Sequence, residues 1–99
     1  MNKKILKLYV VRDVLIGYGV VPGISAVINF ENDEVALRAL KESMFPGQKP
    51  NVFNVHPEDK ELWCVGELDL DTGMIIACQP VLIGKAIDYV VRGVEDEVN

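Results

Sequence analysis

The order of apolar and polar residues predicts strands in the first third of the chain. Residues 4–12 are apolar with interleaved lysines, and the run from Tyr9 to Val11 favours a strand. The even positions from Ile24 to Phe30 are apolar and polar residues alternate with them, which is the period of a half-buried strand.

Helical signals follow the second strand. Asn32 or Asp33 can cap a helix, and residues 36–44 are good helix formers. A Pro-Gly pair at residues 46–47 ends the predicted helix. Residues 56–59 predict a short helical turn, because proline suits the first helical position and acids suit the first turn.

The clearest hairpin lies around Gly73, which fits the left-handed position that ends a type I turn. Pairing Leu70 with Met74 sets the predicted register. One hairpin face is then expected to face the core: Leu62, Cys64, Leu68, Leu70, Met74, Ile76 and Cys78. The other face is expected to point outward: Trp63, Val65, Glu67, Asp69, Ile75, Ala77 and Gln79.

A last helix is predicted after Pro80, with Gly93 as its stop, from the spacing of Ile83, Ala86, Ile87, Val90 and Val91. The element order is β-β-α-β-β-α, which indicates an α+β fold. We expect a small antiparallel sheet of about four strands with one or two helices packed on one face. Residues 1–92 are expected to form a single domain, and residues 93–99 an acidic, flexible tail.

Composition supports a soluble globular domain. The 99 residues are 49% hydrophobic and 25% charged. We find no apolar run of the roughly 20 residues that a membrane span needs and no secretory signal, so we expect an intracellular protein without membrane contact. The net charge of −5 argues against general attraction to a polyanion, although residues 1–12 hold only basic charges.

The candidate chemistry is sparse. His56 is the single histidine, and Cys64 and Cys78 form no CxxC pair, so we expect no catalytic residue, metal ion or cofactor, and no enzyme. The two cysteines are expected to be reduced core residues. The acidic residues between Glu58 and Asp71 are expected to form a solvated hairpin face.

Aromatic and basic residues leave two interpretations open. Trp63 on the outer hairpin face, with Tyr9 on a neighbouring strand, can stack nucleobases. Alternatively, Trp63 and Val65 cover a helix or a subunit interface. The basic N-terminal residues can form a short phosphate track, or they can be lysines that protect an edge strand from aggregation.

Several fragments, taken in order, resemble one family. They are Tyr9-Val10-Val11-Arg12-Asp13, Asn32-Asp33-Glu34-Val35-Ala36-Leu37-Arg38-Ala39, His56-Pro57-Glu58-Asp59, Leu62-Trp63-Cys64, Gly66-Glu67-Leu68-Asp69, Thr72-Gly73 and Gln79-Pro80. From about residue 8 to residue 82 the chain resembles the small nonstructural protein of gokushovirus-type microviruses, which are single-stranded DNA phages.

The resemblance implies a nonstructural protein in the host cytoplasm that binds single-stranded DNA during genome replication or packaging. It transfers no catalytic residue. The candidate DNA-binding residues are Lys3, Lys4, Lys7, Tyr9, Arg12, Arg38, Lys41 and Trp63. The alternative is a non-catalytic interaction module, which pairs with itself or with a phage or host protein and has no DNA affinity. We expect a homodimer in either case.

Overall fold

The structure is a computed structural model that describes residues 4–14 and 23–91. In these ranges the chain forms strands and helices in the following order. They are β1 (Ile5–Asp13), β2 (Gly23–Phe30), α1 (Asp33–Ser43), the 3₁₀ helix η1 (Pro57–Asp59), β3 (Lys60–Asp69), β4 (Ile75–Lys85) and the 3₁₀ helix η2 (Ala86–Tyr89). Lys3 and the predicted tail at 93–99 lie outside the described residues.

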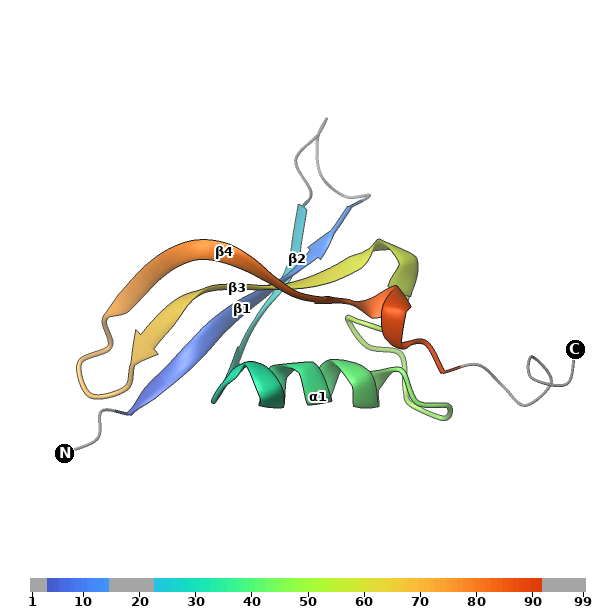
Figure 1. Cartoon of the computed structure of the whole chain (residues 1–99), viewed down its shortest axis with the longest axis horizontal. Coiled ribbons are helices and arrows are strands. Elements are labelled where there is room, and N and C mark those ends of the chain that lie inside the picture. The colour runs from blue at the N-terminus through green and yellow to red at the C-terminus, as the bar shows by residue number, and fades with distance from the viewer. Residues whose placement is uncertain (1–3, 15–22, 92–99) are drawn as a thin grey trace, which may run out of the picture.

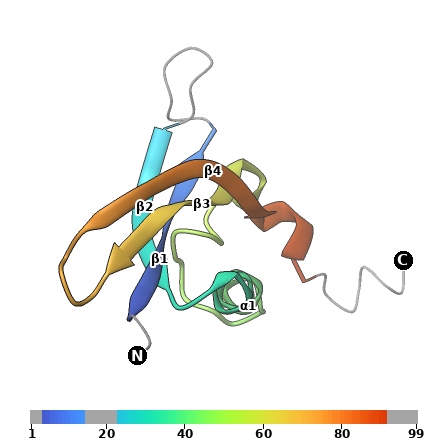
Figure 2. The ribbon, with the colours of Figure 1, turned by 60° about the vertical axis from the view of Figure 1, so that its left-hand side comes forward.

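The four strands form one antiparallel sheet in the order β2-β1-β3-β4 (Figure 1). β1 is central and pairs with both β2 and β3. α1 lies against one face of this strongly twisted sheet (Figure 2). The predicted α+β class, with an antiparallel sheet and a helix on one face, is therefore confirmed in outline.

The core lies between α1 and the sheet. The side chain of Asn32 caps the helix, since its Oδ1 accepts the backbone N–H of Val35 at 2.9 Å. The buried core residues come from every layer: Tyr9, Val11, Ala36, Leu40, Met44, Phe53, Leu62, Cys64 and Ala86. Burial of this apolar stripe of α1 is what holds the helix against the strands.

The predicted last helix is wrong. The chain after Pro80 stays in β4, where Gly84 pairs with Leu62 and Lys85 with Glu61, and up to residue 91, where the described part ends, only η2 follows. Backbone hydrogen bonds to β3 outweigh the helical spacing of the apolar residues. Pro80 is tolerated because β4 is an edge strand with a register irregularity at this point. The order β-β-α-β-β-α is corrected accordingly.

The predicted hairpin register is also wrong by one residue. The N–H of Asp69 donates to the carbonyl of Met74 at 2.9 Å, and Leu68 pairs with Ile75. A shift of one residue turns every side chain of a strand to the opposite face. Gly73 does have the predicted left-handed conformation, with φ of 78°.

Most of the predicted hairpin core is exposed to solvent, as are residues 70–82 on both faces of the hairpin. Leu62 and Cys64 are buried as expected. The remaining part of the hairpin extends past the start of α1 (Figure 1), so none of the described helices lies beneath its tip. The predicted core residues that are exposed are Leu70, Met74, Ile76 and Cys78.

Candidate nucleic-acid interface

The two faces of the sheet have different neighbours. Tyr9 and Val11 of β1 point toward α1 and are fully buried. Val10 and Arg12 alternate with them and therefore point to the other side. Within the described part of the chain, no helix lies over that side (Figure 2). We call it the open face, with the residues Val10, Arg12, Val27, Glu61, Trp63, Leu82 and Lys85.

Strand pairing arranges apolar residues of the open face in a row across all four strands. Val10 of β1 pairs with Val27 of β2 on one side and with Trp63 of β3 on the other. Trp63 in turn pairs with Leu82 of β4. Val27 is 70% exposed and Leu82 40% exposed, so the row ends in accessible apolar side chains at both edges.

Arg12 and Trp63 form the centre of the open face. The guanidinium carbon of Arg12 lies 4.4 Å from the centroid of the Trp63 ring, which is a cation–π arrangement. The Trp63 Nε1–H donates to Oε1 of Glu61 at 3.0 Å. Glu61 of β3 is the cross-strand partner of Arg12 on β1 and of Lys85 on β4. The Trp63 ring therefore contacts one cation and one carboxylate on the open face, and Lys85 is the cross-strand neighbour of that carboxylate.

Lys7 and Tyr9 lie on the helix side instead. Both donate to Oδ1 of Asp33, Lys7 Nζ at 3.0 Å and the Tyr9 hydroxyl at 2.7 Å. The hydrogen bond from Tyr9, together with that from Lys7, lowers the pKa of Asp33, and the bond to Asp33 raises the pKa of Lys7. Burial, reinforced by this hydrogen bond, raises the pKa of Tyr9. Tyr9 has no exposed ring face on which a base can stack.

The other candidate residues are dispersed. Arg38 and Lys41 are exposed on α1, and Lys41 Nζ lies 5.3 Å from the Tyr89 ring centroid. Lys4 is exposed just before β1, and its carbonyl accepts the N–H of Leu70 at 2.8 Å. Among the residues that it describes, the structure thus brings Arg12 and Trp63 together on the open face and Lys7 and Tyr9 together at Asp33 on the helix side.

Sequence reasoning missed Glu61 and Lys85. Glu61 accepts the hydrogen bond from the Trp63 indole. The only signal in the sequence is the alternation of residues 60–64, which puts Glu61 and Trp63 on the same face of the strand. The sequence pattern predicts a helix around Lys85, so nothing in it indicates that Lys85 of one strand pairs with Glu61 of the next.

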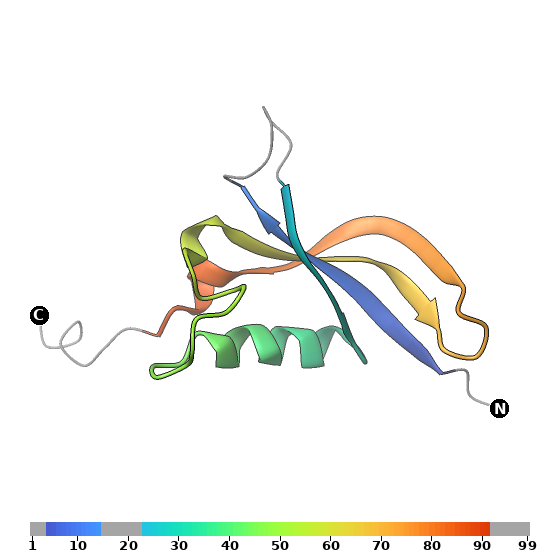
Figure 3. The same ribbon diagram turned by 180° about the vertical axis from the view of Figure 1, so that it is seen from behind.

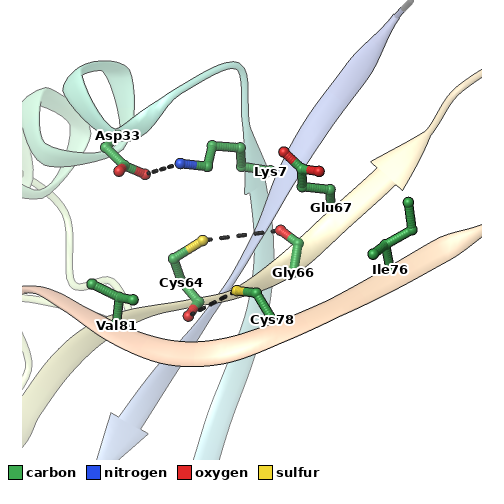
Figure 4. A pocket seen from close by; sticks show the side chains of 8 residues that line it. All are labelled: Lys7, Asp33, Cys64, Gly66, Glu67, Ile76, Cys78 and Val81. Atoms are coloured by element: carbon green, nitrogen blue, oxygen red, sulfur yellow. Dashed lines mark hydrogen bonds and ion pairs between the residues drawn. The ribbon is translucent and has the colours of Figure 1, made fainter.

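A pocket of about 330 Å³ lies on the helix side, between the start of α1 and β4 (Figure 4). Lys7, Asp33 and Glu67 line it together with both thiols. Both cysteines are free, as expected; Cys64 is buried and Cys78 exposed. Burial raises the pKa of the Cys64 thiol, which keeps it protonated as a small core residue.

The family comparison agrees with a viral origin. The model of the Phage ORF5 protein family matches residues 6–89. The chain is therefore a phage protein. It belongs to the Phage ORF5 protein family. No curated protein and no solved structure matches it. None of the helices in the described residues is long and apolar enough to cross a membrane.

Proposed function

We propose that this phage protein is not an enzyme and binds single-stranded DNA across the open face. One observation carries the proposal: the Arg12 guanidinium lies over the Trp63 ring on a sheet surface that no described helix covers. Indole rings stack on nucleobases of any sequence, and each stacked base contributes about 1–3 kcal/mol. The planar guanidinium of Arg12 offers a second stacking surface and a donor to phosphate.

Local charge favours a polyanion at this place despite the net charge of −5. Arg12 and Lys85 flank Glu61, so cations outnumber carboxylates in this row of the open face. Two phosphate contacts give a shallow salt dependence. The logarithm of the affinity for single strands falls with the logarithm of the salt concentration, with a slope of about −0.7 per phosphate contact. A fourfold rise in salt concentration therefore weakens binding by roughly sevenfold.

The process that we propose is replication or packaging of a single-stranded genome in the host cytoplasm. The resemblance of residues 8–82 to the nonstructural protein of gokushovirus-type microviruses supports this, together with membership of a phage family. Lys7 and Tyr9 are left out of the proposed DNA surface, because both are hydrogen-bonded to Asp33 on the helix side.

The test is fluorescence anisotropy of a labelled oligothymidine with matched variants. Arg12→Gln and Trp63→Leu are each expected to weaken binding roughly tenfold, which corresponds to about 1.4 kcal/mol. Arg38→Gln removes the same charge from the exposed side of α1 and is expected to bind like the unaltered protein. If Arg38→Gln weakens binding as much as Arg12→Gln does, the open face is not the DNA surface.

A protein-interaction module is the second candidate, because the hairpin tip is apolar and exposed. Met74 and Ile75 are 64% and 67% exposed, and Leu70 and Ile76 about half exposed. Exposed apolar patches of this kind mark sites that contact other proteins. This candidate predicts no affinity for the labelled oligothymidine, so the same titration separates the two functions.

A further inference from the structure

The two edges of the sheet are not equivalent. At the β4 edge, residues 78–80 oppose the single residue Val65, because Cys64 pairs with Val81 and Gly66 with Ala77. This irregularity contains Pro80, and Lys85 follows at the strand end. Bulges, prolines and lysines are the usual devices that stop an edge strand from pairing with another chain.

The β2 edge has neither a proline nor a charge, and its one irregularity is at Ser25, near the start of the strand, where Val11 pairs with Ala26 and Arg12 with Ile24. Its eight residues, Gly23–Phe30, contain no charge and no proline, and in the described part of the chain β2 pairs only with β1. Figure 3 views the sheet from this side, with β2 in front of β1. Val27 is 70% and Ile24 50% exposed. The free edge therefore offers unpaired backbone groups and accessible apolar side chains together.

We infer that β2 pairs antiparallel with β2 of a second copy of this chain, around a two-fold axis. The pairing centred on Val27 places Val27 opposite its own copy and Ala26 opposite Ile28. Apolar residues then meet apolar ones, and the irregularity at Ser25 lies outside this central pairing. The product is a continuous eight-stranded sheet with both α1 helices on the same side.

Charge identifies a second copy as the occupant. Two copies with a net charge of −5 each repel one another, so an uncharged segment is where they can approach at the lowest electrostatic cost. β2 belongs to the longest uncharged run of the chain, from Val14 to Phe30. An antiparallel strand is also complementary to itself, which is the condition for an interface that is the same on both subunits.

The dimer presents two open faces to the same partner, which one copy alone cannot do. Because the axis runs perpendicular to the sheet, both Arg12–Trp63 pairs lie on the same side of the eight-stranded sheet. Self-association itself requires no DNA and is tested without it, so its failure and the failure of DNA binding are distinguishable.

The test is sedimentation equilibrium of the full chain in the absence of nucleic acid. The unaltered protein is expected to have twice the chain mass of 11.0 kDa. Val27→Lys places like charges opposite each other at the axis, so its mass is expected to fall twofold. Ile75→Lys is the matched control, because Ile75 is 67% exposed on the opposite edge strand. It is expected to leave the dimer intact.

A cross-link tests the register independently of the lysine variants. In a Cys78→Ser background, Val27→Cys is expected to form a disulfide-linked dimer under mild oxidation with oxidised glutathione, and Ile75→Cys is not. An unaltered protein with the mass of one chain overturns the inference. So does a pair of lysine variants in which only Ile75→Lys dissociates the dimer.

Discussion

At the scale of single residues, the carboxylate of Asp33 connects the first turn of α1 to two side chains of β1. Sequence analysis treated it as a possible helix cap, and treated Lys7 and Tyr9 as DNA ligands. Instead, Asn32 caps the helix, and Asp33 accepts hydrogen bonds from both β1 side chains. The sequence did not reveal this because residues 8–11 are all apolar, so alternation alone does not tell which face of β1 is buried.

The first prediction concerns the acid stability that Asp33 confers. Its pKa in the folded protein lies below the ordinary 3.8, so its carboxylate stabilises the fold above that pH, and this stabilisation disappears as the pH falls through the lowered pKa. The bond from Tyr9 contributes about 1 kcal/mol. The half-exposed pair with Lys7 contributes less, since solvent screens it.

Asp33→Asn is therefore expected to lower the free energy of unfolding at neutral pH by about 1 kcal/mol. It should also flatten the loss of stability as the pH falls below the ordinary pKa of 3.8. Urea denaturation over a pH series measures both effects. Glu34→Gln removes the neighbouring charge but neither hydrogen bond, and serves as the control. An acid transition in Asp33→Asn as steep as in the unaltered protein would contradict this role.

At the scale of elements, sequence patterns predicted each strand and α1 but not how β4 pairs. Both sides of the hairpin carry apolar residues, because Ile75 and Ile76 are adjacent. Period-two patterning therefore could not fix the register. The irregularity opposite Val65 then moves the rest of β4 relative to β3. Only the pairing of β4 with β3 shows that Ile83 lies near the end of a strand and not in the predicted last helix.

Gly66 lies where this pairing is tightest. A Cβ at Gly66 would lie 2.6 Å from the backbone oxygen of Ile76, which cannot move without shifting β4. Gly66→Ala is expected to lower the free energy of unfolding by roughly 1–3 kcal/mol. Gly84→Ala is the control, since its Cβ would meet only side chains, those of Leu40 and Tyr89 at 3.2 Å and Leu37 at 3.3 Å, which need to shift by a few tenths of an ångström. Urea melts compare the two, and equal losses would show that β4 yields easily at Gly66.

At the scale of the whole molecule, the sheet separates its functions by face and edge. One face packs on α1, the open face presents Arg12 and Trp63, and β2, which pairs only with β1 among the described residues, is the edge at which we propose that a second copy binds. The net charge of −5, read alone, argues against DNA. The distribution of charge changes this conclusion, because cations outnumber carboxylates around Trp63. The sequence placed Trp63 on an outer face, but the approach of Arg12 depends on the pairing of β1 with β3.

DNA binding at the open face is the central claim, and the fluorescence of Trp63 tests it most directly. Trp63 is the only tryptophan of the chain, so its emission reports on that face alone. Titration with single-stranded DNA is expected to quench it, with an affinity that falls roughly sevenfold from 50 to 200 mM salt. Unchanged emission, together with unchanged anisotropy of the labelled DNA at low salt, would contradict the account and leave a protein as the partner of this face.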